Sequence, residues 1–325
     1  MRKKAETCLK YQYYNNTGLK ISPVGLGTLT LGPFQLNLPV NEGAEIIASA
    51  VRRGINLIDT AKVYKTYPYV KRALEILSTR EKENLHVIAR SYDYSYKGMQ
   101  ISFNEALREM NLGRISIFML HEMQSAQTIR GHSDAIKYLL QMKKEGKLLA
   151  TGISSHYISA VRAAADHPEI DVIFAILNIK GIGIIDGTRE EMEEALLEAH
   201  NNGKVILVMK ALGGGHLYGN PEAALSYVKN LPFPCSTIIG MQNITEIEYN
   251  VSFFSEGDKI RKPPAPLKNK KKLFIEPWCS GCGACVTACP FGALSIINGK
   301  VVPGEACVLC SYCAGSCPGF NIKVV

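Results

Sequence analysis

The chain has 325 residues, of which 46% are hydrophobic and 20% charged, and its formal net charge is +8. This composition is ordinary for a globular protein with room for one large domain and one small domain. No apolar run approaches the roughly 20 residues that cross a membrane, Met1–Tyr14 lacks the apolar core of a secretion signal, and the basic residues form no aromatic-interleaved face for nucleic acid. We therefore expect a cytoplasmic protein that binds neither membranes nor nucleic acids.

Between residues 21 and 255, short apolar runs alternate with longer stretches of helical spacing. The predicted strands are Val24–Gly27, Asn56–Asp59, Leu85–Arg90, Ser116–His121, Leu149–Ser154, Val172–Leu177, Val205–Lys210 and Ser236–Gly240. The predicted helices include Glu42–Arg53, Val70–Leu77, Ile101–Met110, Asp134–Lys144, Arg189–Asn201 and Pro221–Lys229. Three glycines, Gly54, Gly113 and Gly203, stand where helix ends favour a left-handed residue.

Strands that alternate with helices in this way over roughly 240 residues predict an α/β fold of the (β/α)8 TIM barrel type. A doubly wound sheet is the alternative, but it needs a G-x-G-x-x-G turn after the first strand, where this chain has only Gly25-Leu26-Gly27. The proline- and lysine-rich segment 261–272 predicts a solvated linker. We expect the barrel over residues 1–260 and a small α+β domain over residues 273–325.

Eight of the ten cysteines follow residue 278, in two copies of C-x₂-C-x₂-C-x₃-C-P. This is the spacing of bacterial two-cluster ferredoxins, in which the fourth cysteine of each run binds the other cluster. We therefore assign Cys279, Cys282, Cys285 and Cys317 to one 4Fe–4S cluster, and Cys307, Cys310, Cys313 and Cys289 to a second one. Zinc is the alternative, but its sites use two C-x₂-C pairs and four ligands in total. The remaining Cys8 and Cys235 are interpreted as buried apolar side chains.

Three ionisable residues, Asp59, Arg90 and His121, end separate predicted strands, and Tyr64 follows Asp59 closely. The carboxyl ends of the strands carry the chemistry in TIM barrels. A phenol beside a cation ionises more readily and can donate a proton, the carboxylate can anchor the cation, and the imidazole can orient a carbonyl oxygen. Each residue alone also has a structural explanation, as a cap, a core histidine or a packing tyrosine.

Three segments, TGLKISPVGLGT (Thr17–Thr28), NLIDTAKVY (Asn56–Tyr64) and IFMLH (Ile117–His121), resemble the aldo-keto reductase family. The whole chain resembles the subgroup with a C-terminal two-cluster ferredoxin domain. The resemblance implies a (β/α)8 barrel and NAD(P)H-dependent carbonyl reduction by an Asp, Tyr, Lys and His tetrad in which Tyr donates the proton. Asp59, Tyr64 and His121 match three positions. Arg90 stands where the family has lysine, and arginine keeps the charge but cannot relay a proton.

The resemblance also places a nicotinamide site, with departures from the family pattern. Its matching positions are Ser154, Lys210, Gly213, Gly214, Gly240 and Asn250. Gly240 and Glu246 stand where the family has the lysine and arginine of its adenosine-phosphate segment, and a carboxylate repels a 2′-phosphate. Met209 replaces the aromatic residue that stacks on the nicotinamide. The sequence therefore leaves NAD(P)H open as a cofactor beside the two clusters.

Three functions are compatible with these features. The first is a carbonyl oxidoreductase with Tyr64 as proton donor and electrons linked to the clusters. The second is a redox enzyme that does not use a nicotinamide cofactor and receives single electrons through its clusters from a ferredoxin, a flavodoxin or another redox protein. The third is an electron-transfer or docking subunit with a vestigial barrel, for which Lys268–Lys272 would bind an acidic partner. Aromatic residues in the loops Leu31–Pro39 and Ser91–Gln100, namely Phe34, Tyr92, Tyr94 and Tyr96, predict a small, partly apolar substrate.

Overall fold

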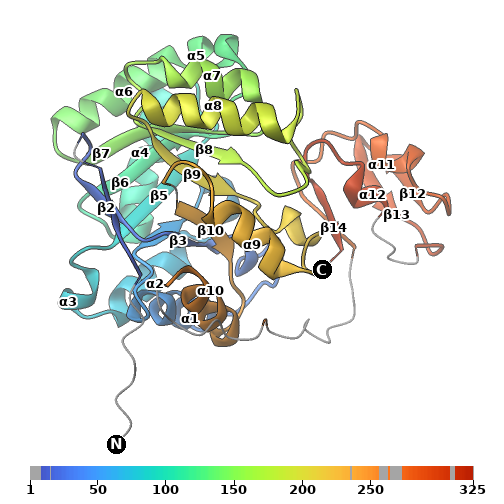
Figure 1. The fold of residues 1–325 in the computed structure, drawn as a ribbon, viewed down its shortest axis with the longest axis horizontal. Coiled ribbons are helices and arrows are strands. Elements are labelled where there is room, and N and C mark those ends of the chain that lie inside the picture. Colours follow the sequence, from blue (N-terminus) through green and yellow to red (C-terminus); the bar gives the residue numbers. More distant parts are fainter. Residues whose placement is uncertain are drawn as a thin grey trace, which may run out of the picture.

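The computed structural model describes residues 9–14, 16–234, 236–255, 263, 273–307 and 312–324. Its main body is a closed barrel in which each strand is parallel to its neighbours (Figure 1). The barrel strands are β3 (Val24–Gly27), β4 (Leu57–Asp59), β5 (His86–Ser91), β6 (Ile115–Leu120), β7 (Leu148–Ser155), β8 (Val172–Ile176), β9 (Val205–Met209) and β10 (Ser236–Gly240). β10 pairs with β3 and closes the ring. The predicted TIM barrel is therefore confirmed.

The strands read as continuous apolar runs because both of their faces are covered, one by the barrel interior and one by helices. β6 and β9, for example, are buried at every residue. The helices around the barrel are α1 (Val40–Arg52), α2 (Tyr67–Ile76), α3 (Thr79–Lys82), α4 (Tyr96–Met110), α5 (Ala126–Gly131), α6 (Ser133–Lys144), α7 (Ile158–Ala165), α8 (Arg189–Asn201), α9 (Pro221–Lys229) and α10 (Ile244–Phe254). A hairpin of β1 (Gln12–Tyr14) and β2 (Leu19–Ile21) precedes the first barrel strand.

Two helix ends agree with the glycine prediction, and one does not. Gly54 and Gly203 adopt positive φ angles of 95° and 81° after α1 and α8. After α4, however, Asn111 takes the left-handed conformation with φ 54°. The prediction for Gly113 was therefore wrong, because asparagine also tolerates this conformation and ends the helix two residues earlier.

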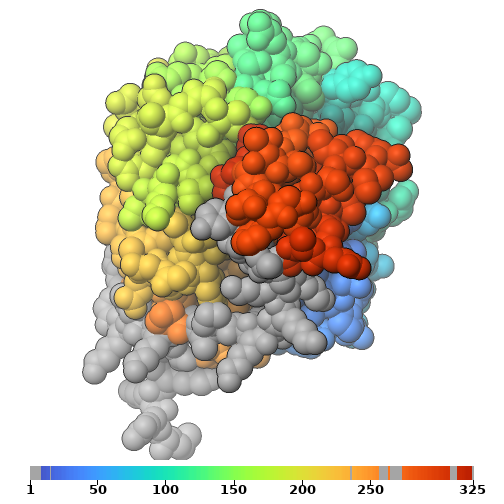
Figure 2. Space-filling model, turned by 90° about the vertical axis from the view of Figure 1, so that its right-hand side faces the viewer, coloured from blue at the N-terminus to red at the C-terminus, as the bar shows by residue number. Residues whose placement is uncertain are grey.

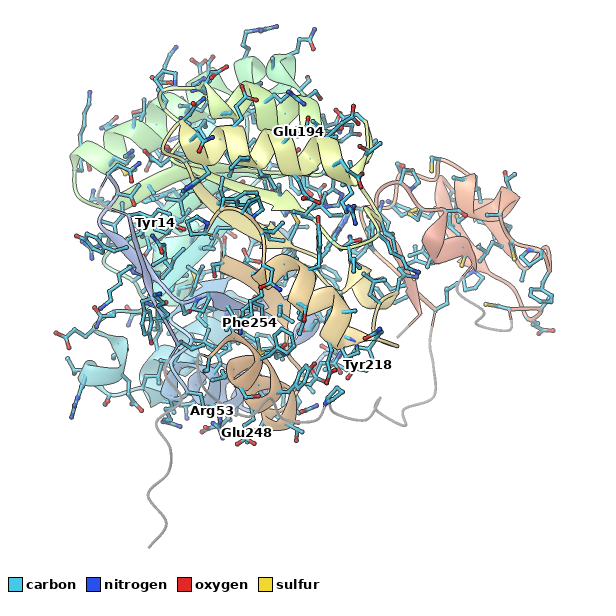
Figure 3. All side chains as sticks on the ribbon, in the orientation of Figure 1. Tyr14, Arg53, Glu194, Tyr218, Glu248 and Phe254 are labelled. Carbon is cyan, nitrogen blue, oxygen red and sulfur yellow. The ribbon has the colours of Figure 1, made fainter. Side chains whose placement is uncertain are left out.

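The first and last helices of the barrel are tied together at its seam. Arg53, at the end of α1, forms an ion pair of 3.0 Å with Glu248 of α10, and the two side chains lie next to each other (Figure 3). The same arginine donates to the Ser49 carbonyl at 3.1 Å. This pairing supports the contact between α1 and α10 beside the strands β3 and β10 that close the barrel.

The C-terminal domain consists of two small antiparallel sheets and two short helices. β11 (Leu273–Ile275) pairs with β14 (Ile322–Val324), and β12 (Leu294–Ile297) pairs with β13 (Lys300–Pro303). The helices are α11 (Ala284–Thr287) and α12 (Tyr312–Gly315). Its own core gathers four cysteines with Leu294, Val301, Ala314 and Ile322. Of the predicted linker, only Pro263 is among the described residues, so its bounds stay a prediction.

The C-terminal domain lies across one end of the barrel. Viewed from that side, the orange-red lobe covers the face between the green, yellow and blue segments (Figure 2). β14 packs against the 3-10 helix η3 (Gly213–Gly215), which follows β9. The covered end is thus the carboxyl end of the strands, where TIM barrels hold their active sites.

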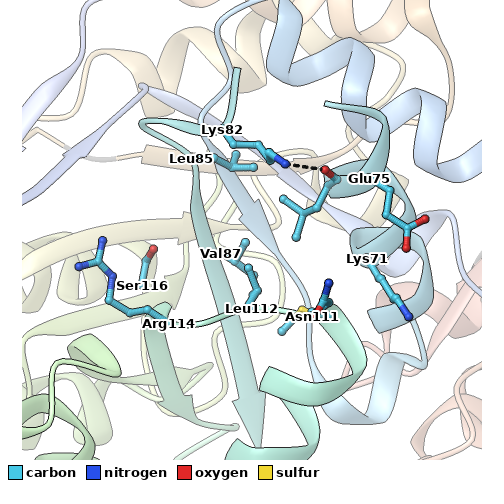
Figure 4. A pocket seen from close by; sticks show the side chains of 11 residues that line it. Lys71, Glu75, Lys82, Leu85, Val87, Asn111, Leu112, Arg114 and Ser116 are labelled. Carbon is cyan, nitrogen blue, oxygen red and sulfur yellow. Dashed lines mark hydrogen bonds between the residues drawn. The ribbon is translucent and has the colours of Figure 1, made fainter. Parts of the chain in front are cut away.

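A cavity of about 280 Å³ opens at the opposite end of the barrel (Figure 4). Leu85 and Val87 of the β5 segment and Arg114 and Ser116 of the β6 segment line it, at the amino ends of these strands. In TIM barrels this end serves stability and not chemistry. Across the described ranges, no helix is long and apolar enough to span a membrane.

Candidate active site

The three ionisable residues predicted at strand ends and the nearby Tyr64 come together at the carboxyl end of the barrel. Asp59 ends β4, Arg90 lies in β5 and His121 follows β6, so neighbouring strands place them side by side. Tyr64 closes the 3-10 helix η2 (Lys62–Tyr64) directly after β4. The Thr28 hydroxyl donates to the Asp59 carbonyl at 2.9 Å, which ties the end of β4 to the segment after β3.

Arg90 is the centre of this group. One guanidinium nitrogen, Nη2, donates to Asp59 Oδ2 at 2.6 Å and to the Tyr64 hydroxyl at 2.9 Å. The other, Nη1, lies 3.3 Å from His121 Nε2. The Arg90 guanidinium also lies over the rings of Tyr64 and Phe174, at 5.2 and 5.0 Å from their centroids. A lysine has a single ammonium group and lacks the planar fork of donors that lets Arg90 reach three partners. The arginine therefore changes which side chains are hydrogen-bonded in the site, in addition to keeping the positive charge.

Burial controls how Asp59 and Tyr64 hold their protons. Burial raises the pKa of Asp59 to about 6 although Arg90 lowers it, so the carboxyl is ionised at neutral pH. Burial also raises the pKa of Tyr64, and this effect outweighs the influence of Arg90. The expectation that the cation makes this phenol more acidic was therefore wrong. The phenol keeps its proton at neutral pH, and because Arg90 donates to its oxygen, its own hydrogen can be offered to a ligand.

His121 differs from its predicted role, in which the imidazole orients a carbonyl oxygen. Burial and the neighbouring Arg90 hold the pKa of His121 well below its ordinary value, so the imidazole is neutral. A guanidinium only donates hydrogen bonds. Nε2 therefore accepts from Arg90 in the observed contact, which places the ring hydrogen on Nδ1, a buried atom with no partner in the described structure. In this arrangement His121 supports Arg90 and does not present a donor from Nε2.

Strained backbone surrounds these residues. Lys65, Glu122 and Lys210 adopt left-handed φ angles of 56°, 56° and 58°, directly after Tyr64, after His121 and after β9. Such angles are uncommon for residues other than glycine, asparagine and aspartate, and they gather at functional sites. Three of them at one end of the barrel support this end as the active site.

A second buried polar pair lies at the ends of β7 and β9. Lys210 Nζ is 3.0 Å from Nε2 of His156, which follows β7. Burial lowers the pKa of Lys210 to about 7, with nearby Lys323 adding to the effect. Burial and the neighbouring Lys210 hold the pKa of His156 well below its ordinary value, so this imidazole is neutral. His156 was not among the predicted site residues, although it lies two positions after the predicted strand Leu149–Ser154.

Phe320 of the C-terminal domain covers this pair. Its ring lies 4.6 Å from Lys210 Nζ and 6.1 Å from the His156 ring. The ring packs directly against two glycines with positive φ, Gly183 and Gly214. A Cβ atom would lie 1.6 Å from the ring at Gly183 and 2.9 Å from it at Gly214, so only glycine leaves room for the ring. Phe320 itself has φ 54°, which is an outlier for an aromatic residue. The glycine-rich turn after β9 thus receives an aromatic side chain of the second domain.

The other residues predicted for a nicotinamide lie on several different elements of the barrel. Ser154 is buried and accepts the Glu122 N–H at 3.0 Å. Gly213 lies in η3, and Gly240 ends β10 next to Thr30. Asn250 is buried in α10 and donates to the Glu246 carbonyl at 2.9 Å. Their assignment to a dinucleotide stays a prediction.

Among the loop aromatics, the structure brings two to the site. The Tyr92 ring stacks on His121 with centroids 4.4 Å apart, and its hydroxyl donates to Glu122 at 2.7 Å. Phe34 contacts Trp278. Tyr96, predicted in a loop, begins α4 and packs on Tyr138 between helices. It therefore lies outside the site.

Four of the described cysteines, Cys279, Cys285, Cys313 and Cys317, lie in the core of the C-terminal domain. Burial raises the pKa of Cys285, and the nearby thiols of Cys317 and Cys279 raise it further, so three members of the first set lie near one another in the domain core. In both motifs the sulfur of the fourth cysteine accepts a hydrogen bond from the backbone N–H four residues later in the chain. Ala293 donates to Cys289 at 3.3 Å, and Asn321 donates to Cys317 at 3.2 Å. Such bonds tune iron–sulfur clusters.

The buried Cys279, Cys285 and Cys317 share the surroundings expected of ligands to one 4Fe–4S cluster, and the assignment of the full set with the exposed Cys282 stays a prediction. Nowhere in the described ranges do three His, Cys, Asp or Glu side chains gather as ligands of a single ion would. A 4Fe–4S cluster is larger than a single ion and takes its thiolates on separate irons. In the second set, Cys310 lies outside the described residues, while Cys289 and Cys307 are half-buried and Cys313 is buried.

Comparison with known proteins agrees with this geometry. A model of the aldo/keto reductase family matches residues 23–222, and a model of the 4Fe-4S binding domain matches residues 274–295. L-galactose dehydrogenase of Arabidopsis thaliana is 22% identical over 317 residues, which cover 85% of this chain and 98% of the relative. NADH-specific methylglyoxal reductase of Escherichia coli (strain K12) is 25% identical over 226 residues, 62% of this chain and 67% of the relative.

The solved structures show the same barrel. A Pseudomonas aeruginosa protein described as an aldo-keto reductase superposes with a TM-score of 0.62 at 26% identity, over 76% of this chain and 94% of that one. The family match spans more than half of the chain, and it includes the strand ends that carry Asp59, Arg90 and His121. The chain therefore belongs to the aldo/keto reductase family and carries a C-terminal 4Fe-4S binding domain.

Proposed function

We propose that this oxidoreductase interconverts a small, partly apolar carbonyl compound and its alcohol in the barrel mouth, with Tyr64 as the proton donor. The observation that carries the proposal is the contact of Arg90 Nη2 with both Asp59 and Tyr64, at 2.6 and 2.9 Å. Asp59 fixes the guanidinium, the guanidinium fixes the phenol oxygen, and the phenol hydrogen remains available for a carbonyl oxygen. Negative charge that develops on that oxygen is stabilised by the adjacent cation.

The reaction in the reducing direction is R₂C=O + 2 e⁻ + 2 H⁺ → R₂CHOH. Tyr64 supplies the proton that reaches oxygen, and the phenol regains it from solvent. The second proton, which forms the C–H bond once both electrons have reached the substrate, also comes from solvent. Two bound 4Fe–4S clusters would supply single electrons at low potential, which together match the pair that the reaction needs. The reductant is then a low-potential redox protein of the ferredoxin or flavodoxin class. With NAD(P)H as the donor, one hydride would deliver both electrons and the second hydrogen to carbon.

One observation favours the second candidate, a reductase that does not use nicotinamide. Phe320 lies against Lys210 and Gly214, two of the residues that the family resemblance proposes for the dinucleotide. A dinucleotide that uses these residues would have to displace the ring. NADH is the competing electron donor, because the Escherichia coli relative is named an NADH-specific reductase.

The deciding experiment uses the anaerobically purified chain with its clusters. NADH or NADPH is added, and the iron–sulfur absorbance near ~400 nm is followed, together with nicotinamide binding by fluorescence. We expect neither bleaching nor binding in the wild-type protein, and binding in Phe320→Ala. Rapid bleaching of the wild-type protein by NADH would instead support the hydride-donor mechanism.

The role of Tyr64 is tested with Tyr64→Phe, which removes only the hydroxyl. Tyr67→Phe is the matched control, because Tyr67 is a buried tyrosine in the next helix whose hydroxyl has no partner in the described structure. We expect Tyr64→Phe to lower turnover by roughly 10²–10⁴-fold with a carbonyl substrate, while Tyr67→Phe stays close to wild type. Full turnover of Tyr64→Phe would remove the proton-donor assignment.

A further inference from the structure

Trp278 is the only tryptophan of the chain, and the C-terminal domain places it in the barrel mouth. Its ring lies 6.2 Å from the Tyr64 ring at an interplanar angle of 31°. It also meets the Phe34 ring edge-on, with the centroids 5.6 Å apart. The next residue in the chain is Cys279, the first cysteine of the first motif. One residue therefore touches the proposed proton donor with its side chain and is peptide-bonded to a proposed cluster ligand.

The sheet of β11 and β14 fixes the place of Trp278. The Glu276 N–H donates to the Asn321 carbonyl at 2.7 Å, and the Cys279 N–H donates to the Glu276 carbonyl at 3.0 Å. The Glu276 carboxylate forms a buried ion pair with Lys323 of β14. Trp278 thus lies within a tight turn whose two ends are held by hydrogen bonds, and a charge pair locks that turn to the neighbouring strand.

The other strand of this sheet supplies a second anchor on the barrel. Phe320 precedes β14, and its N–H donates to the carbonyl of the proposed ligand Cys317 at 3.1 Å. Its ring is seated on Gly183 and Gly214. Cys279 and Cys317 belong to the same proposed set of ligands, so both barrel contacts come from residues beside one cluster. Cys279 and Cys317 therefore lie on a side of the domain that faces the barrel mouth.

We propose that Trp278 connects the iron–sulfur domain to the active site of the barrel. Its ring covers the substrate site beside Tyr64, and its backbone joins that site to the proposed cluster ligand Cys279, so that electrons from the cluster reach the substrate. This inference rests on the proposed function, and the balanced reaction and its class of reductant are those given above. A flat indole face beside a phenol suits a flat, partly apolar carbonyl compound. Trp278 is a positioning residue here, because it sets the contact between substrate, Tyr64 and the ligand loop and does not itself exchange protons.

The first test concerns placement and needs no substrate. Trp278 is the sole tryptophan, so protein fluorescence reports on this residue alone. We expect weak quenching by acrylamide in the loaded wild-type chain, because the ring is half-buried between Phe34 and Tyr64. Phe34→Ala should raise the quenching constant severalfold. Tyr94→Ala, which removes a ring that is 68% exposed in the neighbouring loop, should leave it unchanged.

The second test concerns electron delivery. The clusters are reduced with dithionite, the excess is removed, and reoxidation is followed by absorbance after adding methylglyoxal or benzaldehyde. Ferricyanide serves as an acceptor that does not need the barrel. We expect Trp278→Leu to slow reoxidation by the two aldehydes roughly tenfold or more, with ferricyanide rates and the electron paramagnetic resonance spectrum of the reduced clusters unchanged. Trp278→Phe should restore part of the rate.

The matched control is Phe291→Leu, which changes a 50% exposed aromatic residue two positions after the proposed ligand Cys289. It should match the wild type with every acceptor. Unchanged aldehyde rates in Trp278→Leu would overturn the role of Trp278 and leave the proposed function standing. If neither aldehyde reoxidises the wild-type clusters, the proposed function fails with these substrates, and so does the inference that rests on it. Tryptophan emission that acrylamide quenches freely in the wild type overturns the placement on its own.

Discussion

The buried pair of Asp59 and Arg90 offers the sharpest test of how the site is held together. Replacing Arg90 by methionine keeps an unbranched, apolar side chain of similar length but removes the charge and all five donors. The carboxylate of Asp59 then stays in the protein interior without its partner at 2.6 Å. Tyr64 and His121 lose the same donor group, because Arg90 also reaches both of them.

The magnitude follows from burial. The side chains of Arg90 and Asp59 are only 3% and 5% exposed, so water cannot replace the lost partner. Removing one member of a buried ion pair costs about 3–5 kcal/mol, and we expect Arg90→Met to lower the free energy of unfolding by that amount. Asp59→Asn should cost a similar amount because it leaves the guanidinium unpaired. The double variant should cost clearly less than the sum, since it leaves no isolated charge.

The assay is urea unfolding of the full, cluster-loaded chain under anaerobic conditions. Far-UV circular dichroism is the signal, because α1 to α10 all belong to the barrel. The four proteins, wild type, both single variants and the double variant, form a double-mutant cycle that isolates the coupling between the two residues. Arg90→Lys separates charge from shape: it keeps the cation, loses the fork, and should fall between wild type and Arg90→Met.

Two results would refute this reasoning. If each single variant costs less than about 1 kcal/mol, the pair behaves like an exposed ion pair, and the dry site described above is wrong. If the two single costs add in the double variant, Asp59 and Arg90 do not interact energetically, and the carboxylate does not hold the guanidinium in place.

Three further predictions concern other parts of the chain. Burial lowers the pKa of Lys210 from 10.5 to about 7, so the folded state binds a proton here less readily than the unfolded state. The stability that the neutral amine contributes is present above pH 10.5 and is lost as the pH falls through 7. Lys210→Met should therefore flatten the dependence of the free energy of unfolding on pH between these two values. Cys317→Ser should remove the cluster of the first cysteine set and leave the other, so that bound iron per chain falls by about half; an unchanged iron content would contradict the assignment. Gly214→Ala combines a φ of 63° with a Cβ 2.9 Å from the Phe320 ring, and it should loosen the docked domain and raise acrylamide quenching of the tryptophan. Gly215→Ala is its control, because φ is 101° there but nothing lies within 4 Å; equal effects of the two substitutions would show that backbone strain, and not the aromatic contact, is responsible.

Local patterns were sufficient for the architecture of the barrel. The apolar runs at Val24–Gly27 and Ser236–Gly240 became the two strands that close the ring, with the predicted bounds. A strand buried on both faces is recognisable because its hydrophobicity is continuous over a short stretch. Helix ends were less certain, as Asn111 and Gly113 show, because more than one residue type tolerates the left-handed conformation that ends a helix.

The sequence by itself also predicted which residues share the carboxyl end of the barrel, since Asp59, Arg90 and His121 each stand at a strand end and parallel strands place those ends together. The cysteine spacing likewise predicted the iron–sulfur domain, because ligand loops are local in sequence. Neither pattern could predict how protons are held. The pKa of Tyr64 depends on burial beneath other segments, and that burial outweighs the cation beside it.

Only the tertiary structure decided that the C-terminal domain covers this end of the barrel with Trp278 and Phe320. Both residues are far in the chain from Tyr64 and Gly214, which they contact. Such contacts join segments whose sequences carry no shared periodicity, and they depend on shape. Two glycines leave room for the Phe320 ring, and an ion pair between Glu276 and Lys323 joins the segments next to the two rings. The sequence determined the barrel and the cysteine motifs, and packing between them determined the site.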